Sequence, residues 1–331
     1  MSANPTVSVV LSVRNGGADL PKALGTILNQ SFSDFEVIAI NNGSSDGTHV
    51  FLDKVADPRV RVYHQDDRGL SAALNRGISL ARGRYIARQD HDDWALPTRL
   101  AKQVAFLDAN PDHALLGTRA EIWVGDRPTG RFHDHPTEDA ELRFALLFKN
   151  YMVHSSVMMR KAALDQVGVY TTDPSRQPPE DYELWSRIAR RFRVANLAER
   201  LTIYREVPTS MSRENVDPFK EKLILITAEN LAMAADGTSK PGRIHLDIAC
   251  LAHNAPEKVS PTANIGEMCA VISRAGAAIF GSRSFDRNSD PVALWQRSLR
   301  YQFIFDKLGL RRARKVGSSL RSTLRHFGLS I

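Results

Sequence analysis

The stretch Arg84-Tyr-Ile-Ala-Arg-Gln-Asp-His-Asp-Asp93 is a short β-type run that ends in three carboxylates, Asp90, Asp92 and Asp93. Ligands of open α/β sheets bind at the carboxyl ends of the strands. Carboxylates crowded at such an edge repel one another unless a cation lies among them. The hard cations that they prefer, Mg²⁺ and Mn²⁺, are usually shared with substrate phosphates. We therefore expect a metal–diphosphate site here. The alternative is that Asp92 or Asp93 only caps a helix that begins near Pro97.

Strand and helix patterns alternate around this stretch, through the first 125 residues. The expected strands cover residues 7–13, 35–40, 60–63, 84–89 and 114–124, and the expected helices cover residues 19–30, a segment that ends near 56, 70–81 and 97–108. The run from Val7 to Val13 is continuously apolar or β-branched, which suits a strand covered on both faces. Alternation of this kind predicts an α/β fold with a parallel, doubly wound sheet.

The pattern loosens after residue 130. We expect helices over 138–148 and from Glu180, a Pro-rich loop over 173–179, and strands over 153–159, 193–197 and 201–205. From Asn215 onward the pattern is largely helical, with breaks at 237–242, 256–261 and 282–291. We interpret this last part as an α-helical appendage to the sheet-containing domain.

Composition narrows the class of protein. Hydrophobic content of 43% and charged content of 24% are ordinary for a soluble globular protein. Cys250 and Cys269 are the only cysteines, which excludes a Cys-rich zinc site and a disulfide framework. Residues 1–5 lack a basic region followed by an apolar run, and no stretch approaches the roughly 18 apolar residues of a membrane-spanning helix. We expect a cytoplasmic protein without a secretory signal.

The net charge of +7 is concentrated at the C-terminus, because residues 307–331 hold seven more basic than acidic side chains. Val316, Leu320, Leu324 and Phe327 recur there at helical spacing, which predicts an amphipathic helix with a basic face. Such a helix suits peripheral contact with an anionic membrane. The alternative is a terminal helix docked on its own domain. Nucleic-acid binding is not expected, because no basic platform interleaved with aromatic residues is present.

Several motifs stand in a fixed order along the chain. They are Val7-Ser-Val-Val-Leu-Ser-Val-Arg-Asn15, Asn41-Asn-Gly-Ser-Ser-Asp-Gly-Thr48, Arg68-Gly-Leu-Ser-Ala-Ala-Leu-Asn-Arg-Gly77, the segment from Gly83 to Asp93, His154-Ser-Ser-Val-Met-Met-Arg160, Glu180-Asp-Tyr-Glu-Leu-Trp-Ser-Arg187 and Tyr204-Arg205. In this order the chain resembles a bacterial family 2 glycosyltransferase of the GT-A fold over residues 5–212. The resemblance implies a GT-A domain over 1–212, with a nucleotide-binding half at 1–125 and an acceptor half at 126–212. Residues 213–331 form the helical region beyond it.

The resemblance implies an inverting transfer of sugar from a nucleotide-diphospho-sugar to an acceptor hydroxyl. The leaving diphosphate gathers negative charge, so Mn²⁺ or Mg²⁺ would stabilise it. By resemblance Asp92 is the metal ligand, Asp90 lies toward the ribose or the metal, and His91 is a spacer. The donor would be a UDP- or dTDP-linked sugar.

By resemblance Asp181 is the base that removes the proton of the acceptor hydroxyl. The surroundings agree, because a Pro-rich loop leads to this helix start and Leu184 and Trp185 anchor the helix. The alternative is that Glu180 and Asp181 only satisfy the helix dipole in its first turn. His154, Glu180 and Trp185 are expected on the acceptor side, although His154 also suits a buried histidine with satisfied hydrogen bonds.

The nucleotide is expected over the ends of the first two strands, at Ser12, Arg14, Asn42, Arg68 and Gly69. Gly69 would give backbone access, and Arg68 would pair with a phosphate or remain a solvated loop cation. Three positions depart from the family pattern. Asn42 replaces an acid but offers an amide oxygen to the base. Arg14 replaces an aromatic residue and could stack. Val207 replaces a histidine.

The function expected from these residues is assembly of a bacterial surface polysaccharide, lipopolysaccharide or related glycan at the inner face of the cell membrane. A glycan or lipid-linked acceptor would suit the basic tail. One alternative is a catalytically silent relative that binds nucleotide or glycan, which the changes at Asn42 and Val207 motivate. Another is a membrane-tethered partner protein whose function lies in the tail.

Overall fold

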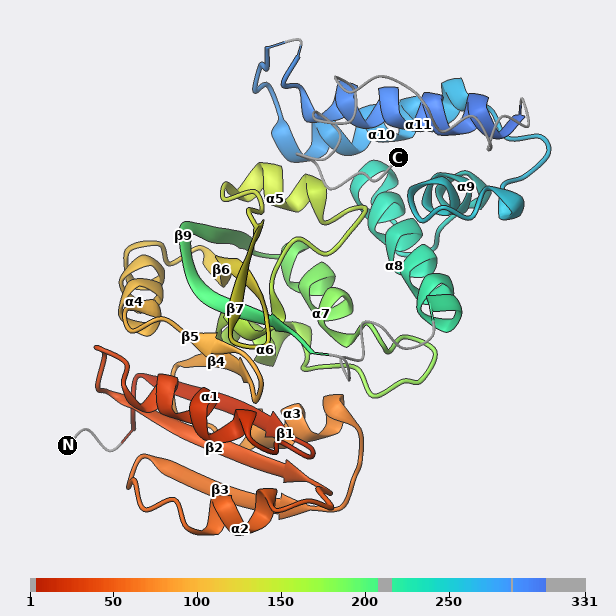
Figure 1. The fold of residues 1–331 in the computed structure, drawn as a ribbon. Helices are drawn as coiled ribbons and strands as arrows, with labels where there is room; N and C mark the ends of the chain where they lie inside the picture. The colour runs from red at the N-terminus through yellow and green to blue at the C-terminus, as the bar shows by residue number, and fades with distance from the viewer. Residues whose placement is uncertain (1–3, 208–215, 287, 308–331) are drawn as a thin grey trace. The chain divides into compact units, whose positions relative to one another are not determined.

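The computed structural model describes residues 4–207, 216–286 and 288–307 (Figure 1). The chain divides into two compact units. The first, here called the sheet unit, comprises residues 1–142 and 151–215, and the second, the helical unit, comprises residues 143–150 and 216–331. Within the described ranges no helix has both the length and the apolar character needed to cross a membrane.

One sheet of nine strands organises the described part of the sheet unit. Its order is β3 (Val60–Gln65), β2 (Phe35–Asn42), β1 (Val7–Val13), β4 (Tyr85–Asp90), β8 (Met158–Arg160), β6 (His113–Val124), β9 (Arg193–Glu206) and β5 (Trp94–Ala95), and β7 (Arg127–His133) pairs with β6. The β1–β2, β2–β3, β1–β4 and β6–β9 pairs are parallel, whereas β8, β5 and β7 run antiparallel to their neighbours. The mostly parallel α/β sheet predicted from the alternating pattern is confirmed.

Helices cover both faces of this sheet (Figure 1). They are α1 (Asp19–Leu28), α2 (Thr48–Asp53), α3 (Leu70–Leu80), α4 (Arg99–Ala109), α6 (Lys161–Val167) and α7 (Glu180–Ala189). Leucines of α1 and α4 share a core with Val7, Val9 and Leu11 of β1. Val10 points to the opposite face, where a Cβ on Gly77 of α3 would lie 2.5 Å from its Cγ1. Residues Val7–Val13 are therefore buried from both sides, as their apolar run predicted.

Two segments differ from the prediction for physical reasons. Residues 154–156 form a 3₁₀ turn, not the start of a strand, because Ser156 Oγ donates to the Val153 carbonyl and accepts from the Thr118 amide. The strands expected at 193–197 and 201–205 are one strand, β9. In the pairing of β9 with β6, Ala198 and Glu199 have no partner residue, so a β-bulge accommodates them within one continuous strand.

The helical unit holds α8 (Val216–Asp236), α9 (Arg243–Ala252), the 3₁₀ turn η3 (Pro256–Lys258), α10 (Ile265–Phe280) and α11 (Pro291–Lys307). Helix α5 (Asp139–Ala145) ends before the predicted limit of 148. Phe148 stacks on Trp295 with ring centroids 3.8 Å apart in the core of this unit. The helical pattern and its breaks are confirmed, whereas the amphipathic tail expected over 307–331 lies outside the described residues from 308 onward.

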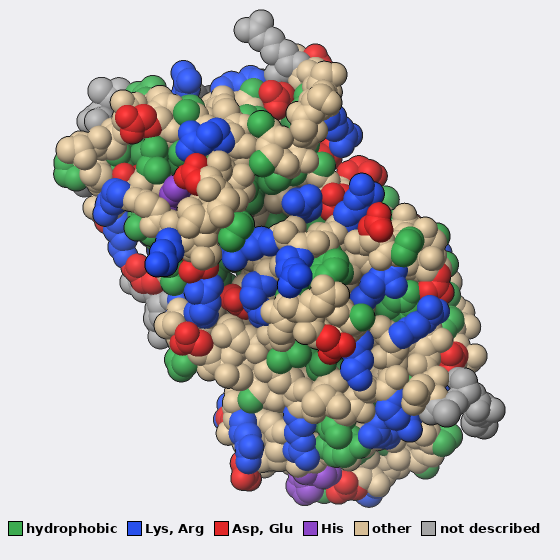
Figure 2. Space-filling view, turned by 180° about the vertical axis from the view of Figure 1, so that it is seen from behind, with side chains coloured by type: hydrophobic (Ala, Val, Ile, Leu, Met, Phe, Trp, Pro, Cys, Tyr) green, Lys and Arg blue, Asp and Glu red, His purple; other side chains and the backbone are tan. Residues whose placement is uncertain are grey.

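The surface carries both signs of charge. On the face drawn in Figure 2, Lys and Arg side chains are spread widely with Asp and Glu side chains among them. Outside residues 307–331 the chain has equal numbers of basic and acidic residues, so this mixture follows from the composition. Mixed charge of this kind is typical of an ordinary solvated surface.

Candidate functional site

Four parallel strands, β3, β2, β1 and β4, end side by side at one edge of the sheet. Ser12 near the end of β1 lies opposite Ile40 of β2 and Asp90 of β4, and Asn42 ends β2 opposite Gln65 of β3. The register therefore brings the predicted site residues Ser12, Asn42 and Asp90 to one edge. Ligands of open α/β sheets bind at such an edge.

Asp90 is held by a buried arginine from its own strand. Arg88 is 1% exposed, and its Nη2 lies 2.5 Å from Asp90 Oδ1. Burial acts to raise the pKa of Asp90, but the charge of Arg88 beside it brings that pKa below its ordinary value. Asp90 is therefore an ionised carboxylate with one oxygen already engaged. The second oxygen is left for a ligand.

Asp93 has a structural role. It is 2% exposed and accepts hydrogen bonds from Ser155 Oγ and, at 2.7 Å, from the main-chain amide of Arg205. Burial, with repulsion from Asp90 and Asp92, raises the pKa of Asp93 well above its ordinary value. Its carboxyl group thus fastens the turn of residues 90–93, here called the acidic turn, to β9.

The capping alternative for these acids is wrong. Helix α4 begins at Arg99, its N-cap is Thr98, and the cap makes no side-chain hydrogen bond. Asp92 and Asp93 lie in the turn that precedes β5, too early in the chain to cap α4. Another explanation is therefore needed for the carboxylate that remains, Asp92.

The Asp92 side chain accepts no hydrogen bond from another residue and forms no ion pair within the described ranges. Burial raises the pKa of Asp92, and the negative charge of Asp90 raises it further. A divalent cation beside Asp92 would remove this unfavourable repulsion. No group of three or more His, Cys, Asp and Glu side chains suited to a metal exists in the described part of the chain. Asp92 and the second oxygen of Asp90 would suit only a cation that takes its other ligands from a diphosphate and water, as Mg²⁺ usually does.

A second pair of carboxylates, Glu180 and Asp181, opens α7. Asp181 is half-buried, and its Oδ1 accepts from the Tyr182 amide at 2.6 Å. Glu180 is 7% exposed, and burial together with the charge of Asp181 raises its pKa to about 7. The charges of Arg88 and Asp90 also act on Glu180. Asp90 and the Glu180–Asp181 pair therefore act on one another electrostatically, although the start of a helix also suits the charge of Glu180 and Asp181.

His154 and Tyr170 are bonded to each other near these acids, since the charges of Asp181, Glu180 and Asp90 act on the Tyr170 hydroxyl. His154 Nε2 lies 2.9 Å from the Tyr170 hydroxyl, and burial, followed by the charge of Arg88, lowers the pKa of His154 to about 3. His154 is thus neutral near pH 7. The Trp185 ring packs edge-on against both side chains and is fully buried. Trp185 therefore supports the two side chains from the core, and its place on the acceptor side stays a prediction.

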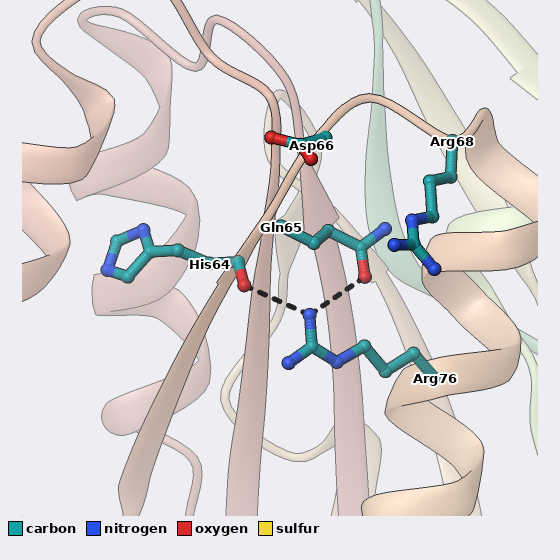
Figure 3. A pocket seen from close by; sticks show the side chains of 5 residues that line it. All are labelled: His64, Gln65, Asp66, Arg68 and Arg76. Atoms are coloured by element: carbon teal, nitrogen blue, oxygen red, sulfur yellow. Dashed lines mark hydrogen bonds between the residues drawn. The ribbon is translucent and has the colours of Figure 1, made fainter.

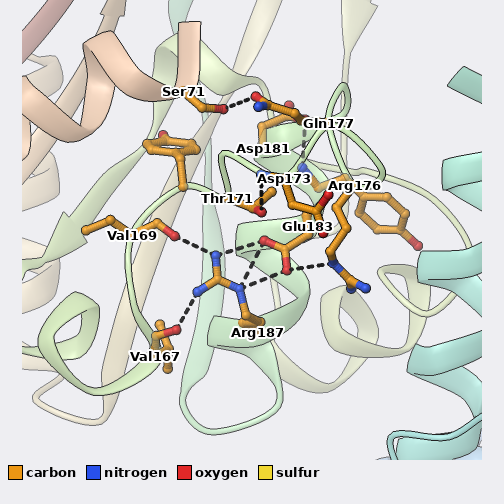
Figure 4. Close-up of polar contacts among 12 residues, drawn as sticks. Ser71, Val167, Val169, Thr171, Asp173, Arg176, Gln177, Asp181, Glu183 and Arg187 are labelled. Atoms are coloured by element: carbon orange, nitrogen blue, oxygen red, sulfur yellow. Dashed lines mark hydrogen bonds and ion pairs between the residues drawn. The ribbon is translucent and has the colours of Figure 1, made fainter. Parts of the chain in front are cut away.

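A polar network fixes the loop that leads to Asp181 (Figure 4). Arg187 Nε lies 3.0 Å from both carboxylate oxygens of Glu183, and its Nη atoms donate to the carbonyls of Val167 and Val169. Gln177 Oε1 accepts from Ser71 Oγ of α3 at 2.5 Å. Glu183, Arg187 and Gln177 were not predicted from the sequence as parts of the site. The sequence feature that could have indicated this ion pair is a Glu and an Arg four residues apart on one helix.

The Asn42 side chain is used internally, which corrects its expected role. Its Oδ1 accepts from Gln65 Nε2 at 2.7 Å and from the Arg68 amide at 3.1 Å, and its Nδ2 donates to Asp67 at 3.0 Å. Both lone pairs of the amide oxygen are therefore occupied. Arg14 likewise forms an ion pair with Asp67 at 2.9 Å, although 60% of its side chain is exposed.

The other predicted nucleotide contacts lie nearby. Ser12 is 6% exposed, and the Gly69 amide donates to Asp67 at 3.0 Å, so it is already engaged. Arg68 lines an open cavity of about 610 Å³ with His64, Gln65, Asp66 and Arg76 (Figure 3). Arg76 is bonded to the His64 carbonyl and to Gln65, each at 3.0 Å. The Arg68 guanidinium forms no hydrogen bond or ion pair in the described parts of the chain, so it is available to an anion.

The Tyr204-Arg205 motif lies at the end of β9. The Arg205 guanidinium pairs with Asp19, donates to the Gly125 carbonyl at 3.1 Å and lies 4.8 Å from the Trp94 ring. Val207 directly follows this strand and is half-buried. Its aliphatic side chain offers no ligand to a metal or a diphosphate. The residues that follow, 208–215, lie outside the described part of the chain.

The chain is similar to known glycosyltransferases in sequence. The family described as Glycosyl transferase family 2 matches residues 8–168. A putative glycosyltransferase, EpsE, from Bacillus subtilis is 30% identical over 241 residues, which are 70% of this chain and 81% of that protein. The O-antigen biosynthesis glycosyltransferase WbnJ from Escherichia coli is 31% identical over 208 residues, 60% of this chain and 79% of that protein.

Solved structures agree in fold. Residues 1–349 of TarS from S. aureus, in complex with UDP-GlcNAc, match with a TM-score of 0.62 and 16% identity over 92% of each chain. The mannosyltransferase PcManGT from Pyrobaculum calidifontis, in complex with GDP-Man and Mn²⁺, matches with a TM-score of 0.50 and 17% identity over 92% of this chain and 89% of that one. The likeness to TarS confirms the GT-A type fold. With the sequence relatives, it leads to the conclusion that this chain belongs to the family 2 glycosyltransferases.

Proposed function

We propose that the protein is an inverting, metal-dependent glycosyltransferase that uses Asp181 as base and Asp92 as the principal metal ligand. The observation that carries the proposal is the difference among the three acids of the turn. Asp90 and Asp93 are engaged by protein groups, whereas Asp92 has no partner in the described ranges. The charge that Asp90 exerts on Glu180 supports a shared site with Asp181.

The reaction requires one bond to form and one to break at the anomeric carbon. The acceptor oxygen attacks this carbon as its proton passes to Asp181, and the bond from the carbon to the diphosphate oxygen breaks on the opposite face. A single displacement of this kind inverts the configuration. A cation held by Asp92 with help from Asp90 would neutralise the leaving diphosphate. Arg68 would add a second positive charge, because a guanidinium binds phosphate oxygens well.

The donor in this proposal is a nucleoside-diphospho-sugar, with uridine or thymidine preferred. TarS binds UDP-GlcNAc and PcManGT binds GDP-Man with Mn²⁺, which supports the donor class and the metal. The name of the O-antigen relative supports a role in bacterial surface polysaccharide or lipopolysaccharide synthesis. A glycan or lipid-linked acceptor would suit that role. Contact with the inner face of the membrane stays a prediction from the tail sequence.

Incubation with a panel of nucleotide-sugars, Mn²⁺ and candidate acceptors tests the proposal. We expect nucleoside diphosphate release that EDTA abolishes, and a product with inverted anomeric configuration by NMR. Asp181→Asn should lower kcat by about 10²-fold or more while donor affinity is kept. Asp165→Asn, at an exposed position of α6, is the matched control and should retain full activity.

The changes at Asn42 and Val207 favour one other function, a catalytically silent relative that binds nucleotide or glycan. A silent relative of this kind would bind the donor and Mn²⁺ but would release no nucleoside diphosphate with any acceptor. Wild-type turnover that disappears in Asp181→Asn excludes it. Turnover that is the same in both proteins contradicts the role of Asp181.

A further inference from the structure

We propose that Ser71 and Asn75 of α3 are positioning residues, which hold the loop that leads to Asp181 at a fixed place relative to the donor. This loop, residues 168–179 between α6 and α7, is here called the base loop. The inference rests on the proposed function, because it concerns how the proposed base is aligned with the donor. Neither side chain was predicted from the sequence as part of the site.

Asn75 binds the main chain of the base loop through both groups of its side-chain amide. Its Nδ2 donates to the Tyr170 carbonyl at 2.8 Å, and its Oδ1 accepts from the Tyr170 amide at 3.0 Å. The orientation of the Asn75 side chain is therefore fixed, because a carbonyl can only accept and an amide N–H can only donate. The base loop contains no helix or strand, so these two bonds hold a segment that lacks a hydrogen-bonded ladder of its own.

The Tyr170 side chain extends from this point toward the acids of the site. It is 3% exposed, and its hydroxyl lies 2.9 Å from His154 Nε2. Burial raises the pKa of this hydroxyl, and the negative charge of Asp181 raises it further. Asn75 therefore fixes the main chain of a residue whose side chain is close enough to Asp181 to interact with it.

Ser71 makes a second bond to the base loop. It stands four residues before Asn75, so the two side chains lie on the same face of α3. Ser71 is 1% exposed, and its Oγ donates to Gln177 Oε1 at 2.5 Å (Figure 4). Three residues separate Gln177 from Asp181, and two of them are prolines, whose rings fix the φ angle. The position of Gln177 therefore restricts the position of Asp181.

Helix α3 is a firm support for these bonds. Leu74 and Ile78 are buried, and a Cβ on Gly77 would lie 2.5 Å from Val10 Cγ1 of β1, so α3 lies directly on the sheet. The helix begins two residues after Arg68, which the proposed function assigns to the diphosphate. One helix thus has a donor contact before its start and the base loop along its side. This matters for the rate, because a misplacement of about 1 Å can slow a reaction about 10²-fold.

Asn75→Asp keeps the size of the side chain, but its carboxylate has no proton to donate to the Tyr170 carbonyl. In the transfer reaction with Mn²⁺ we expect it to lower kcat about tenfold or more, while KM for the nucleotide-sugar changes by less than about twofold. Ser71→Ala should lower kcat in the same way by about threefold. Ser79→Ala is the matched control on α3, because this exposed hydroxyl donates only within the helix, to the Arg76 carbonyl at 2.8 Å, and it should keep the wild-type kcat and KM.

A second background separates positioning from folding. A smaller fraction of folded protein would lower turnover whether or not the carboxylate of Asp181 is present. If Asn75 acts through Asp181, Asn75→Asp should lower kcat about tenfold in the wild type but less than about twofold in Asp181→Asn. An equal loss in both backgrounds, or an unchanged kcat in Asn75→Asp, would overturn the role of Asn75 while leaving the proposed function intact.

Hydrogen exchange of the full chain without any ligand checks the contact itself. Asn75→Ala removes the acceptor of the Tyr170 amide, so peptides from the base loop should exchange about fivefold faster than in the wild type, whereas peptides from β1 should not change. Unchanged exchange in the base loop would overturn the proposed contact. If the wild-type protein turns over no nucleotide-sugar, the proposed function and the positioning role are both wrong, even where exchange confirms the bond.

Discussion

The main-chain amide of Arg205 donates to Asp93 Oδ1 at 2.7 Å, although 112 residues separate them along the chain. This bond fastens the acidic turn after β4 to the end of β9. The Arg205 side chain strengthens the junction through Asp19 and the ring of Trp94. Because Asp93 is turned inward in this way, its neighbour Asp92 is left to meet a ligand.

Adjacent acids should therefore respond differently to substitution. Asp93→Ala would remove two buried hydrogen bonds, so we expect a loss of about 2–4 kcal/mol in the free energy of unfolding. Asp92→Ala removes a carboxylate that repels Asp90, so its stability should stay within about 0.5 kcal/mol of wild type or rise. Urea denaturation measures both values. Equal losses of stability in Asp93→Ala and Asp92→Ala would contradict a structural role for Asp93 that Asp92 lacks.

Glu180 predicts a particular dependence of stability on pH. Its pKa is about 7 in the folded protein against an ordinary value of 4.5, because of burial and then Asp181. The folded state thus binds the proton more tightly, and this contribution to stability is complete below the ordinary value and disappears as the pH rises through about 7. Glu180→Gln does not titrate, so it should gain about 1–3 kcal/mol over wild type at pH 8.

Thermal unfolding of both proteins between pH 5 and pH 8 measures this effect. The Tm of Glu180→Gln relative to wild type should rise with pH over this window. A difference that stays constant, or that falls with increasing pH, would show that the Glu180 carboxyl is not perturbed as described.

The network around Arg187 should control the position of Asp181. Arg187→Met would leave the Val167 and Val169 carbonyls and Glu183 without this donor, so we expect a loss of about 2–3 kcal/mol in stability and a lower kcat. Arg191→Met, in the turn just after α7, is the matched control, because within the described residues the Arg191 guanidinium donates to one group, the Gln166 carbonyl, at 3.2 Å. Its loss should stay within about 1 kcal/mol. Similar kinetics for the two variants would argue against a positioning role for Arg187.

An acid at position 42, which the family pattern favours, should weaken this protein. Asn42→Asp would replace the amide that donates to Asp67 at 3.0 Å by a second carboxylate at the same place. Repulsion between them should cost about 1–3 kcal/mol of stability at pH 8 and lower the affinity for UDP. Differential scanning fluorimetry and titration with UDP measure the two effects. Tighter UDP binding by Asn42→Asp would show that Asn42 contacts the base itself.

The local pattern of the sequence was sufficient to predict most of the fold. The run 7–13 and the alternation after it predicted the parallel strands, because apolar period and turn residues act over short distances. Strands β5 and β7 were missed. Strand β5 has only two residues, and β7 contains Pro128, Gly130 and two arginines, so neither shows strand periodicity.

The site was only partly predictable, because partners distant in sequence decide which side chain is available. Three acids in one turn look alike until Ser155 and Arg205 engage Asp93. Asn42 lost its expected contact with the base because Gln65 and Arg68 occupy its oxygen. Arg88 could have been noticed, since an arginine inside a buried strand requires a charged partner.

Binding of UDP, measured by titration calorimetry with and without Mn²⁺ in the wild type, Asp92→Asn and Asp181→Asn, tests the central claim most directly. Our account predicts that Mn²⁺ strengthens binding to the wild type and to Asp181→Asn by about tenfold or more, and that Asp92→Asn loses this gain. Asp181→Asn should bind UDP normally yet transfer sugar more slowly by about 10²-fold or more. An undiminished Mn²⁺ effect in Asp92→Asn, with normal transfer, would contradict the account.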